Sequence, residues 1–301
     1  MSAPTSAPRV FDRWLLRRRR RRAQALGPAT FLIDRVADDL ADRLASVLRR
    51  FPVAADLGTP TRALRRLLAA RVDALIAVDA DPLALRDDTG PKLVADEEAL
   101  PFADGSLDLA ISALALQSVN DLPGALVQVR RALKPDGLFL AALLGGGTLT
   151  ELRQSFAAAE TEIEGGVSPR VAPLIDAREA GALLQRAGFA LPVADVDRIT
   201  VRYASPFELM RDLRRMGATN ALAERRRKPL RRATLMRMAE VYAARFADAD
   251  GRVRASFDIV WLSGWAPDAS QPQPLKPGSA KVRLADALGT REFSAGEPPE
   301  R

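Results

Sequence analysis

The sequence predicts an α/β fold with a doubly wound parallel sheet of Rossmann-like type. Between residues 53 and 144, short apolar segments alternate with segments whose apolar residues have helical spacing. Gly, Pro and Asp separate these segments, as they do in the turns of α/β sheets. Two later apolar segments, separated by a long stretch of helical pattern, are expected to close one edge of the sheet as an antiparallel pair.

The first half of the chain supplies the parallel strands. A helix is expected within residues 29–50, because Val36, Leu40 and Leu44 recur at helical spacing. The segment 134–137, Lys-Pro-Asp-Gly, predicts a turn before the fifth strand. The remaining expected elements are strands at 53–57, 74–79, 92–95, 107–113 and 138–144, and helices at 61–70, at 121–133 and from Pro82.

The second half predicts the edge of the sheet and the domain boundaries. The expected elements are helices at 148–163 and 176–187, strands at 198–203 and 256–263, and a helical insertion at about 206–247. We expect a basic N-terminal arm over 1–28, one domain over 29–266, and a Pro-rich C-terminal extension over 267–301.

The composition excludes several kinds of chemistry. The chain has neither cysteine nor histidine, which excludes disulfides, cysteine nucleophiles, Ser-His-Asp triads and histidine-based metal sites. We therefore expect no metal site. No apolar stretch has the roughly 18 residues that a membrane span needs, so we expect a cytoplasmic protein, with a peripheral position at the inner membrane as the alternative.

The net charge is +7, and six consecutive arginines occupy positions 17–22. One interpretation is the arginine enrichment typical of a GC-rich genome. The other is an electrostatic docking element, outside the fold, for an anionic membrane, an acidic protein or a nucleic acid.

The ends of the predicted parallel strands carry the candidate binding residues. Ligands of such sheets bind beyond the carboxyl ends of the strands, so these residues should converge. Asp79 lies 21 residues after Gly58, close to the spacing at which an acidic side chain receives ribose hydroxyls, and Asp96 could accept from an adenine amino group. The alternative is that these carboxylates only cap the helices that follow. The candidate cofactor-binding residues are Asp56, Gly58, Thr59, Asp79, Asp96, Glu97 and Leu114.

The loop after the first strand departs from a nucleotide-binding loop. It keeps Asp56-Leu57-Gly58 but has Pro60 and Arg62 where further glycines would let the backbone approach a ligand. Proline also removes one N–H donor. We expect Thr59, Pro60 and Arg62 to narrow the approach to the loop.

The strand ends resemble those of the class I S-adenosylmethionine-dependent methyltransferases, and four segments resemble a narrower family. They are "VFDRWLLRRRR", "TLTELRQSFAAAETEIEGG", "SPFELMRDLRRMGATNA" and "FDIVWLSGW". They are similar to the arginine hydroxylases that act as respiratory complex I assembly factors. That resemblance implies a methyltransferase fold, S-adenosylmethionine as cofactor and a complex I subunit as partner. Gln117-Ser118 stands where that family commonly has His-Trp, so the resemblance identifies no catalytic residue.

Three hypotheses remain open. The first is an S-adenosylmethionine-dependent transferase that acts on a complex I (NADH dehydrogenase) subunit by arginine modification or methyl transfer. The second is a catalytically inactive methyltransferase-fold assembly chaperone with a degenerate cofactor loop. The third, a nucleic-acid-binding module, rests on the arginines alone.

Overall fold

The computed structural model describes residues 9–272 and 282–290. The chain divides into two compact units, Met1–Pro267 and Asp268–Arg301. In the second unit, which contains the expected Pro-rich extension, the structure describes residues 268–272 and the short helix α9 (Leu284–Leu288) with its flanking residues. The rest of that extension, and the first eight residues of the expected basic arm, lie outside the described residues.

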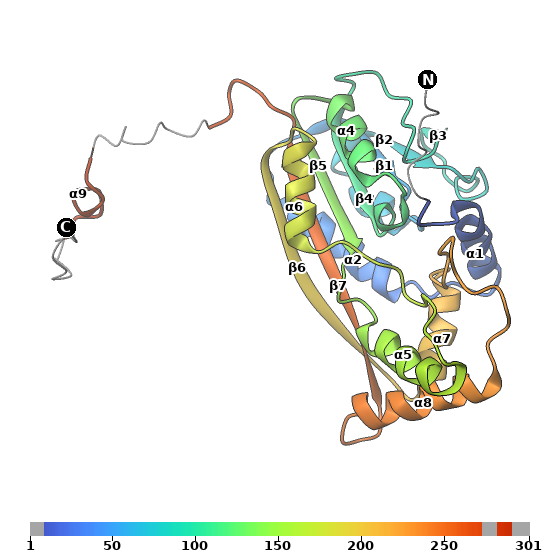
Figure 1. The fold of residues 1–301 in the computed structure, drawn as a ribbon. Helices are drawn as coiled ribbons and strands as arrows, with labels where there is room; N and C mark the ends of the chain where they lie inside the picture. The colour runs from blue at the N-terminus through green and yellow to red at the C-terminus, as the bar shows by residue number, and fades with distance from the viewer. Residues whose placement is uncertain (1–8, 273–281, 291–301) are drawn as a thin grey trace, which may run out of the picture. The chain divides into compact units, whose positions relative to one another are not determined.

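The first unit is built on a seven-stranded sheet with the strand order β3-β2-β1-β4-β5-β7-β6 (Figure 1). The first five strands pair in parallel, and β7 runs antiparallel to both of its neighbours. This confirms the predicted fold and the antiparallel edge. The strands are β1 (Phe51–Leu57), β2 (Val72–Asp79), β3 (Lys92–Val94), β4 (Leu107–Ala113), β5 (Leu133–Leu144), β6 (Ala190–Tyr203) and β7 (Val253–Trp265).

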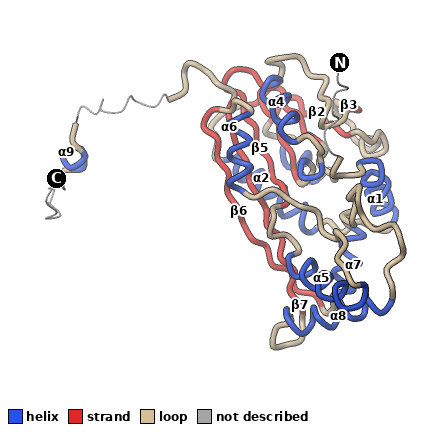
Figure 2. The backbone as a smooth tube through the Cα atoms, in the orientation of Figure 1, coloured by secondary structure: helices blue, strands red, loops and turns tan. Residues whose placement is uncertain are grey.

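Helices cover both faces of the sheet, which explains the continuous apolar strands: all seven residues of β4 are buried. Figure 2 shows the helices α4 and α6 over one face and α2 over the other. The helices of the first unit are α1 (Arg13–Ala25), α2 (Phe31–Ala45), α3 (Ala63–Leu68), α4 (Leu122–Ala132), α5 (Thr150–Glu164), α6 (Ala177–Arg186), α7 (Pro206–Arg215) and α8 (Arg232–Phe246).

Three expected elements differ from the structure. The helix from Pro82 is replaced by successive turns, because the N–H groups of Ala84 and Leu85 donate three residues back, to the carbonyls of Asp81 and Pro82, and not four residues back as in an α-helix. The turn at 134–137 is an irregularity inside β5, where Asp136 has a φ of 58°. Strand β6 begins at Ala190, earlier than expected, because β7 pairs with it along most of its length.

The basic segment also differs from its expected position. Residues 13–25 form α1, which is attached to the segment between α7 and α8 instead of extending into solvent. The N–H of Asp12 donates to the carbonyl of Ala221 at 2.8 Å, and that of Ala223 donates to the carbonyl of Val10 at 2.9 Å. Gly217, with φ +72°, lies directly against the backbone of Arg20. Packing of α1 on this segment explains why its arginines are not a free arm.

Gly217→Ala is expected to destabilise the protein more than Gly165→Ala. Both glycines have φ near +70°, so both substitutions carry the left-handed penalty of roughly 1–2 kcal/mol. A Cβ at Gly217 would lie 3.0 Å from the Arg20 Cα, whereas a Cβ at Gly165 would meet nothing within 4 Å. Thermal unfolding of the two variants isolates the contact with α1. Equal losses of melting temperature would contradict the docked position of α1.

Candidate functional site

The carboxyl ends of β1, β2 and β4 meet at one edge of the sheet, as the sequence predicts. The N–H of Gly58 donates to the carbonyl of Val78 at 2.8 Å, which ties the loop after β1 to the end of β2. The hydroxyl of Ser112 donates to the carbonyl of Leu57 at 2.7 Å, which ties β4 to the same loop. This edge holds the candidate residues Asp56, Gly58, Thr59, Asp79 and Leu114.

Asp56 and Thr59 support the loop from within. The Asp56 carboxylate is completely buried; it accepts a short hydrogen bond from the Thr59 hydroxyl and pairs with the Arg65 guanidinium at 2.7 Å. The Thr59 hydroxyl also accepts from the N–H of Ala113 at 3.0 Å. Burial raises the pKa of Asp56, and Arg65 and Thr59 offset only part of this effect. Direct cofactor contact was expected for both residues, but the buried Asp56 carboxylate presents no open face to a ligand.

Gly58 packs against Glu97 of the acidic segment 96–98. Gly58 has φ +70°, and a Cβ there would come within 2.1 Å of a Glu97 carboxylate oxygen, so the backbone requires glycine. Pro60 lines the adjoining cavity, as does Thr61. The expectation for Arg62 was wrong, because its guanidinium lies 3.3 Å from the Asp88 carboxylate and is not among the residues that line this cavity.

Asp79 ends β2 with a buried carboxylate that is 7% exposed. One of its oxygens accepts from the N–H of Asp81 at 2.7 Å. Burial raises the pKa of Asp79 to about 6, against which the Asp81 N–H and the positive charge of Arg20 act. The carboxylate is therefore ionised at neutral pH and can accept hydrogen bonds, as its predicted ribose-binding role requires.

Helix α1 places a row of arginines over the acidic residues of this edge. Arg13 contacts Asp96 at 3.0 Å and makes a short contact with Glu97, while Arg17 lies 3.5 Å from Asp96. Arg21 makes two hydrogen bonds to the Asp81 carboxylate, at 2.6 and 2.8 Å. The contact of Asp96 with adenine stays a prediction, as its carboxylate already pairs with two guanidiniums.

Helix α1 was not predicted as part of the site, although the sequence carries a signal for it. The arginines at 13, 17, 20 and 21 share one face of a helix, and Asp12 supplies its N-cap by accepting from the N–H of Leu15 at 2.9 Å. Five carboxylates of the site (Asp79, Asp81, Asp96, Glu97 and Glu98) face these four arginines.

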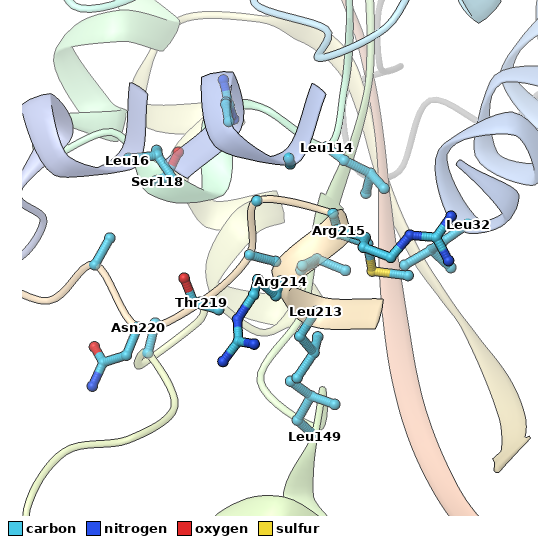
Figure 3. Close-up of a pocket in the computed structure, with 18 of the residues that line it drawn as sticks. Leu16, Leu32, Leu114, Ser118, Leu149, Leu213, Arg214, Arg215, Thr219 and Asn220 are labelled. Carbon is cyan, nitrogen blue, oxygen red and sulfur yellow. The ribbon is translucent and has the colours of Figure 1, made fainter. Parts of the chain in front are cut away.

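A cavity of about 370 Å³ adjoins the loop after β1 (Figure 3). Pro60, Thr61 and the residues that follow β4 form one wall, and α1, α2, α5 and the segment after α7 form the others. Leu114, which has a φ of 50°, lines it together with Gln117 and Ser118. Figure 3 shows Leu32, Leu149, Leu213 and Asn220 around the same space, so segments far apart in the sequence complete the cavity.

The chemistry of this lining is restricted. Apolar side chains, leucine above all, make up most of the lining, joined by the amide and hydroxyl groups of Gln117, Ser118, Thr148, Thr219 and Asn220 and by the guanidiniums of Arg20, Arg170, Arg214 and Arg215. No aspartate or glutamate is among the described residues that line it. The described part of the chain holds no cluster of acidic side chains suited to a metal ion, and no helix in it is both long and apolar enough to cross a membrane.

Comparison with known proteins agrees with this geometry. A family model for a methyltransferase domain matches residues 55–141, which span β1 to β5 and so include the candidate residues. The mitochondrial arginine-hydroxylase NDUFAF5 of Danio rerio is 40% identical over 92% of this chain and 89% of its own length, and that of Homo sapiens is 39% identical over 92% and 83%.

The chain belongs to the family of these arginine hydroxylases. It is also 37% identical to the malonyl-[acyl-carrier protein] O-methyltransferase of Halorhodospira halophila, over 76% of this chain and 79% of that protein. Among solved structures, a proposed methyltransferase from Bacillus halodurans matches with a TM-score of 0.55 at 15% identity, over 77% of this chain and all of that one. That structural likeness supports the class I methyltransferase fold.

Two features of the site suit S-adenosylmethionine. The buried Asp79 carboxylate at the end of β2 offers acceptors for ribose hydroxyls. Five carboxylates face four arginines of α1, so this set of side chains carries one net negative charge when all are ionised. A ligand that carries a sulfonium, an ammonium and one carboxylate has one net positive charge and would balance it.

Arg13→Gln is expected to lower the free energy of unfolding by about 3–5 kcal/mol, because it removes the guanidinium that pairs with the buried Glu97. The double variant Arg13→Gln/Glu97→Gln should recover part of this loss. Denaturant unfolding measures both. Arg131→Gln breaks an exposed ion pair with Asp104 and should change stability by less than about 1 kcal/mol. If Arg13→Gln costs no more than this control, α1 does not close the site.

Asp79→Asn is expected to raise the melting temperature above pH 6 and to lose this advantage at lower pH. Because folding raises the pKa of Asp79 from 3.8 to about 6, its protonated form stabilises the fold, and that stabilisation disappears as the pH rises through 6. The asparagine variant has no charge to desolvate. Thermal unfolding tests this from about pH 4.5, where most of Asp79 is protonated in the folded protein, to about pH 8, where it is ionised. The exposed Asp104→Asn is the charge-matched control. A pH-independent difference would contradict the assignment.

Proposed function

We propose that this protein binds S-adenosylmethionine and acts as a transferase of the methyltransferase type on a protein substrate in the assembly of respiratory complex I. The observation that carries the proposal is the cavity that adjoins the loop after β1 and the end of β4. In a class I fold the reactive end of the cofactor lies at these strand ends, so the cavity would receive the side chain to be modified. The relatives named as arginine hydroxylases supply the link to complex I as a proposal.

The residues of this chain have separable roles in that proposal. Asp79 would accept the ribose hydroxyls, while Asp56, Thr59 and Arg65 would keep the loop in shape. When bound, the cofactor supplies an electrophilic methyl group next to a sulfonium. Gln117 and Ser118, at the wall of the cavity, would orient the acceptor through hydrogen bonds. Most of the lining is apolar and would exclude water from the acceptor.

The lining favours one reaction among those left open. A guanidinium acceptor must lose a proton before it can accept a methyl group, and no aspartate or glutamate is among the described lining residues to take it. A carboxylate acceptor is already ionised and needs no base. Arg214 also lines the cavity, and its guanidinium would attract an anion and repel a second guanidinium. Methyl transfer to a carboxylate is therefore the second candidate function. The name of the O-methyltransferase relatives also describes methyl transfer to oxygen.

Binding is tested first, by calorimetric titration with S-adenosylmethionine and S-adenosylhomocysteine. We expect both to bind, and ligand at about 100 times its dissociation constant to stabilise the protein by about 2.7 kcal/mol. Asp79→Asn should weaken binding at least tenfold. In the parent chain, affinity should fall as the pH drops below 6, because protonation converts the acceptor carboxylate into a donor. Absence of binding would favour the inactive assembly chaperone.

The reaction is tested by mass spectrometry after incubation with a purified complex I subunit and methyl-labelled S-adenosylmethionine. A labelled gain of one methylene unit would establish methyl transfer, and fragment ions would show whether it lies on a carboxylate or on an arginine. A gain of one oxygen without label, on arginine, would establish hydroxylation. A stable complex without mass gain would contradict the transferase and support the chaperone.

A further inference from the structure

We propose that Arg20 holds the carboxylate at the methionine end of bound S-adenosylmethionine and replaces the backbone donors that the loop after β1 lacks. The inference rests on the proposed function and names a positioning residue in the same site. It concerns an arginine from α1, an element outside the strand ends from which the candidate residues were selected.

Arg20 lies where the amino-acid end of the cofactor would be. It lines the cavity together with Pro60, Thr61 and Leu114, which belong to the ends of β1 and β4. It is also close enough to Asp79 and Glu97 for their charges to act on its guanidinium. Arg20 therefore lies between the predicted ribose site and the space left for the substrate.

The backbone of Arg20 is held in place. Gly217 packs against it so closely that an added Cβ would lie 3.0 Å from the Arg20 Cα and 3.2 Å from its Cγ. The start of the Arg20 side chain is confined by the same contact. An arginine fixed in this way loses less conformational entropy when it binds an anion than one on a free surface.

Among the described residues, no hydrogen bond or ion pair engages the Arg20 guanidinium. This separates it from Arg13, Arg17 and Arg21 on the same helix, each of which contacts a carboxylate. Burial lowers the pKa of Arg20, and the charges of Glu97 and Asp79 offset only part of this effect. The Arg20 side chain is partly buried and lines the cavity, so a carboxylate bound there would supply its missing hydrogen-bond partner.

The loop has few donors of its own. The N–H of Gly58 is already bonded to the carbonyl of Val78, and Pro60 has no N–H. A loop with further glycines would present bare backbone here. A guanidinium can give a carboxylate two parallel N–H donors, so one arginine can replace the backbone N–H groups that the loop lacks.

A carboxylate at Arg20 could come from the cofactor or from the substrate, and position favours the cofactor. Arg20 is next to the loop and within the influence of Asp79, whereas Arg214, which also lines the cavity, is exposed and comes from the end of α7. A substrate carboxylate fits the position of Arg214 better. The two sources are separated by ligands that differ only in the cofactor carboxylate.

The test is calorimetric titration of the full chain with S-adenosylhomocysteine and with its decarboxylated analogue, which keeps the adenosine, thioether and amine. The parent chain should bind S-adenosylhomocysteine at least tenfold more tightly than the analogue. Arg20→Gln should lose this preference: affinity for S-adenosylhomocysteine falls at least tenfold, while affinity for the analogue is unchanged. Arg20→Lys, which keeps the charge but loses the paired donors, should recover only part of the preference.

Two controls remove the same charge elsewhere. Arg18→Gln changes an exposed residue of α1 that stacks on Trp14, and Arg214→Gln changes the outer cavity residue; both should retain the preference. Thermal unfolding of Arg20→Gln should show no loss of stability, because no ion pair is broken. The proposal is overturned if Arg20→Gln weakens both ligands equally, if it changes neither, or if Arg214→Gln abolishes the preference instead. If the parent chain binds neither ligand, the proposed function fails as well.

Discussion

The pairing of Arg13 with the acidic segment 96–98 is the interaction on which the rest of the site depends. Glu97 is buried beside Gly58, where its carboxylate fixes how closely the loop after β1 can pack. Without a guanidinium over it, this carboxylate would be charged and without compensation in a place that water hardly reaches. The pairing thus holds α1 over the strand ends and fixes the face on which Arg17, Arg20 and Arg21 point to the site.

The loop that lacks glycines has a consistent physical explanation. Its shape comes from side chains, through the hydrogen bonds and ion pair that join Thr59, Asp56 and Arg65. Glycine is retained where a carboxylate approaches the backbone and is absent where the loop borders the cavity. A loop held by buried side chains can keep the geometry of a binding loop while offering fewer backbone donors. Loss of the glycines by itself therefore says little about loss of binding.

The sequence predicted the parts of the fold that local pattern controls. Strands buried on both faces are continuous apolar runs in the sequence. Asp79 was predicted at the end of β2 because one helix and one strand separate it from Gly58, which limits the number of residues between them. The helix from Pro82 was wrong because backbone bonds that run three residues back compete with the four-residue bonds of a helix, and the shorter bonds form here. Local propensity gives no sign of which competitor wins.

The site was less predictable because its closing residues meet across long separations in the chain. The run of arginines at 17–22 has the composition of a solvated arm, and its acidic partners lie at positions 81 and 96. Likewise, the segment after α7 carries no motif of binding chemistry, yet it completes the cavity and attaches α1. Such contacts depend on how the elements pack, which periodicity and spacing do not encode.

The ion pairs of Arg65 bear on how natural variants of this protein are interpreted. Its guanidinium joins Asp56 under the loop to Asp88 in the turn region after β2, and it is almost as buried as its two partners. A protein with a substitution at Arg65 would keep every residue that faces a ligand, yet the loop would lose the ion pairs that hold Asp56 and Asp88. Sorting variants by distance from the ligand would class such a change as benign, whereas sorting them by shared hydrogen-bond networks would place it with changes in the loop itself.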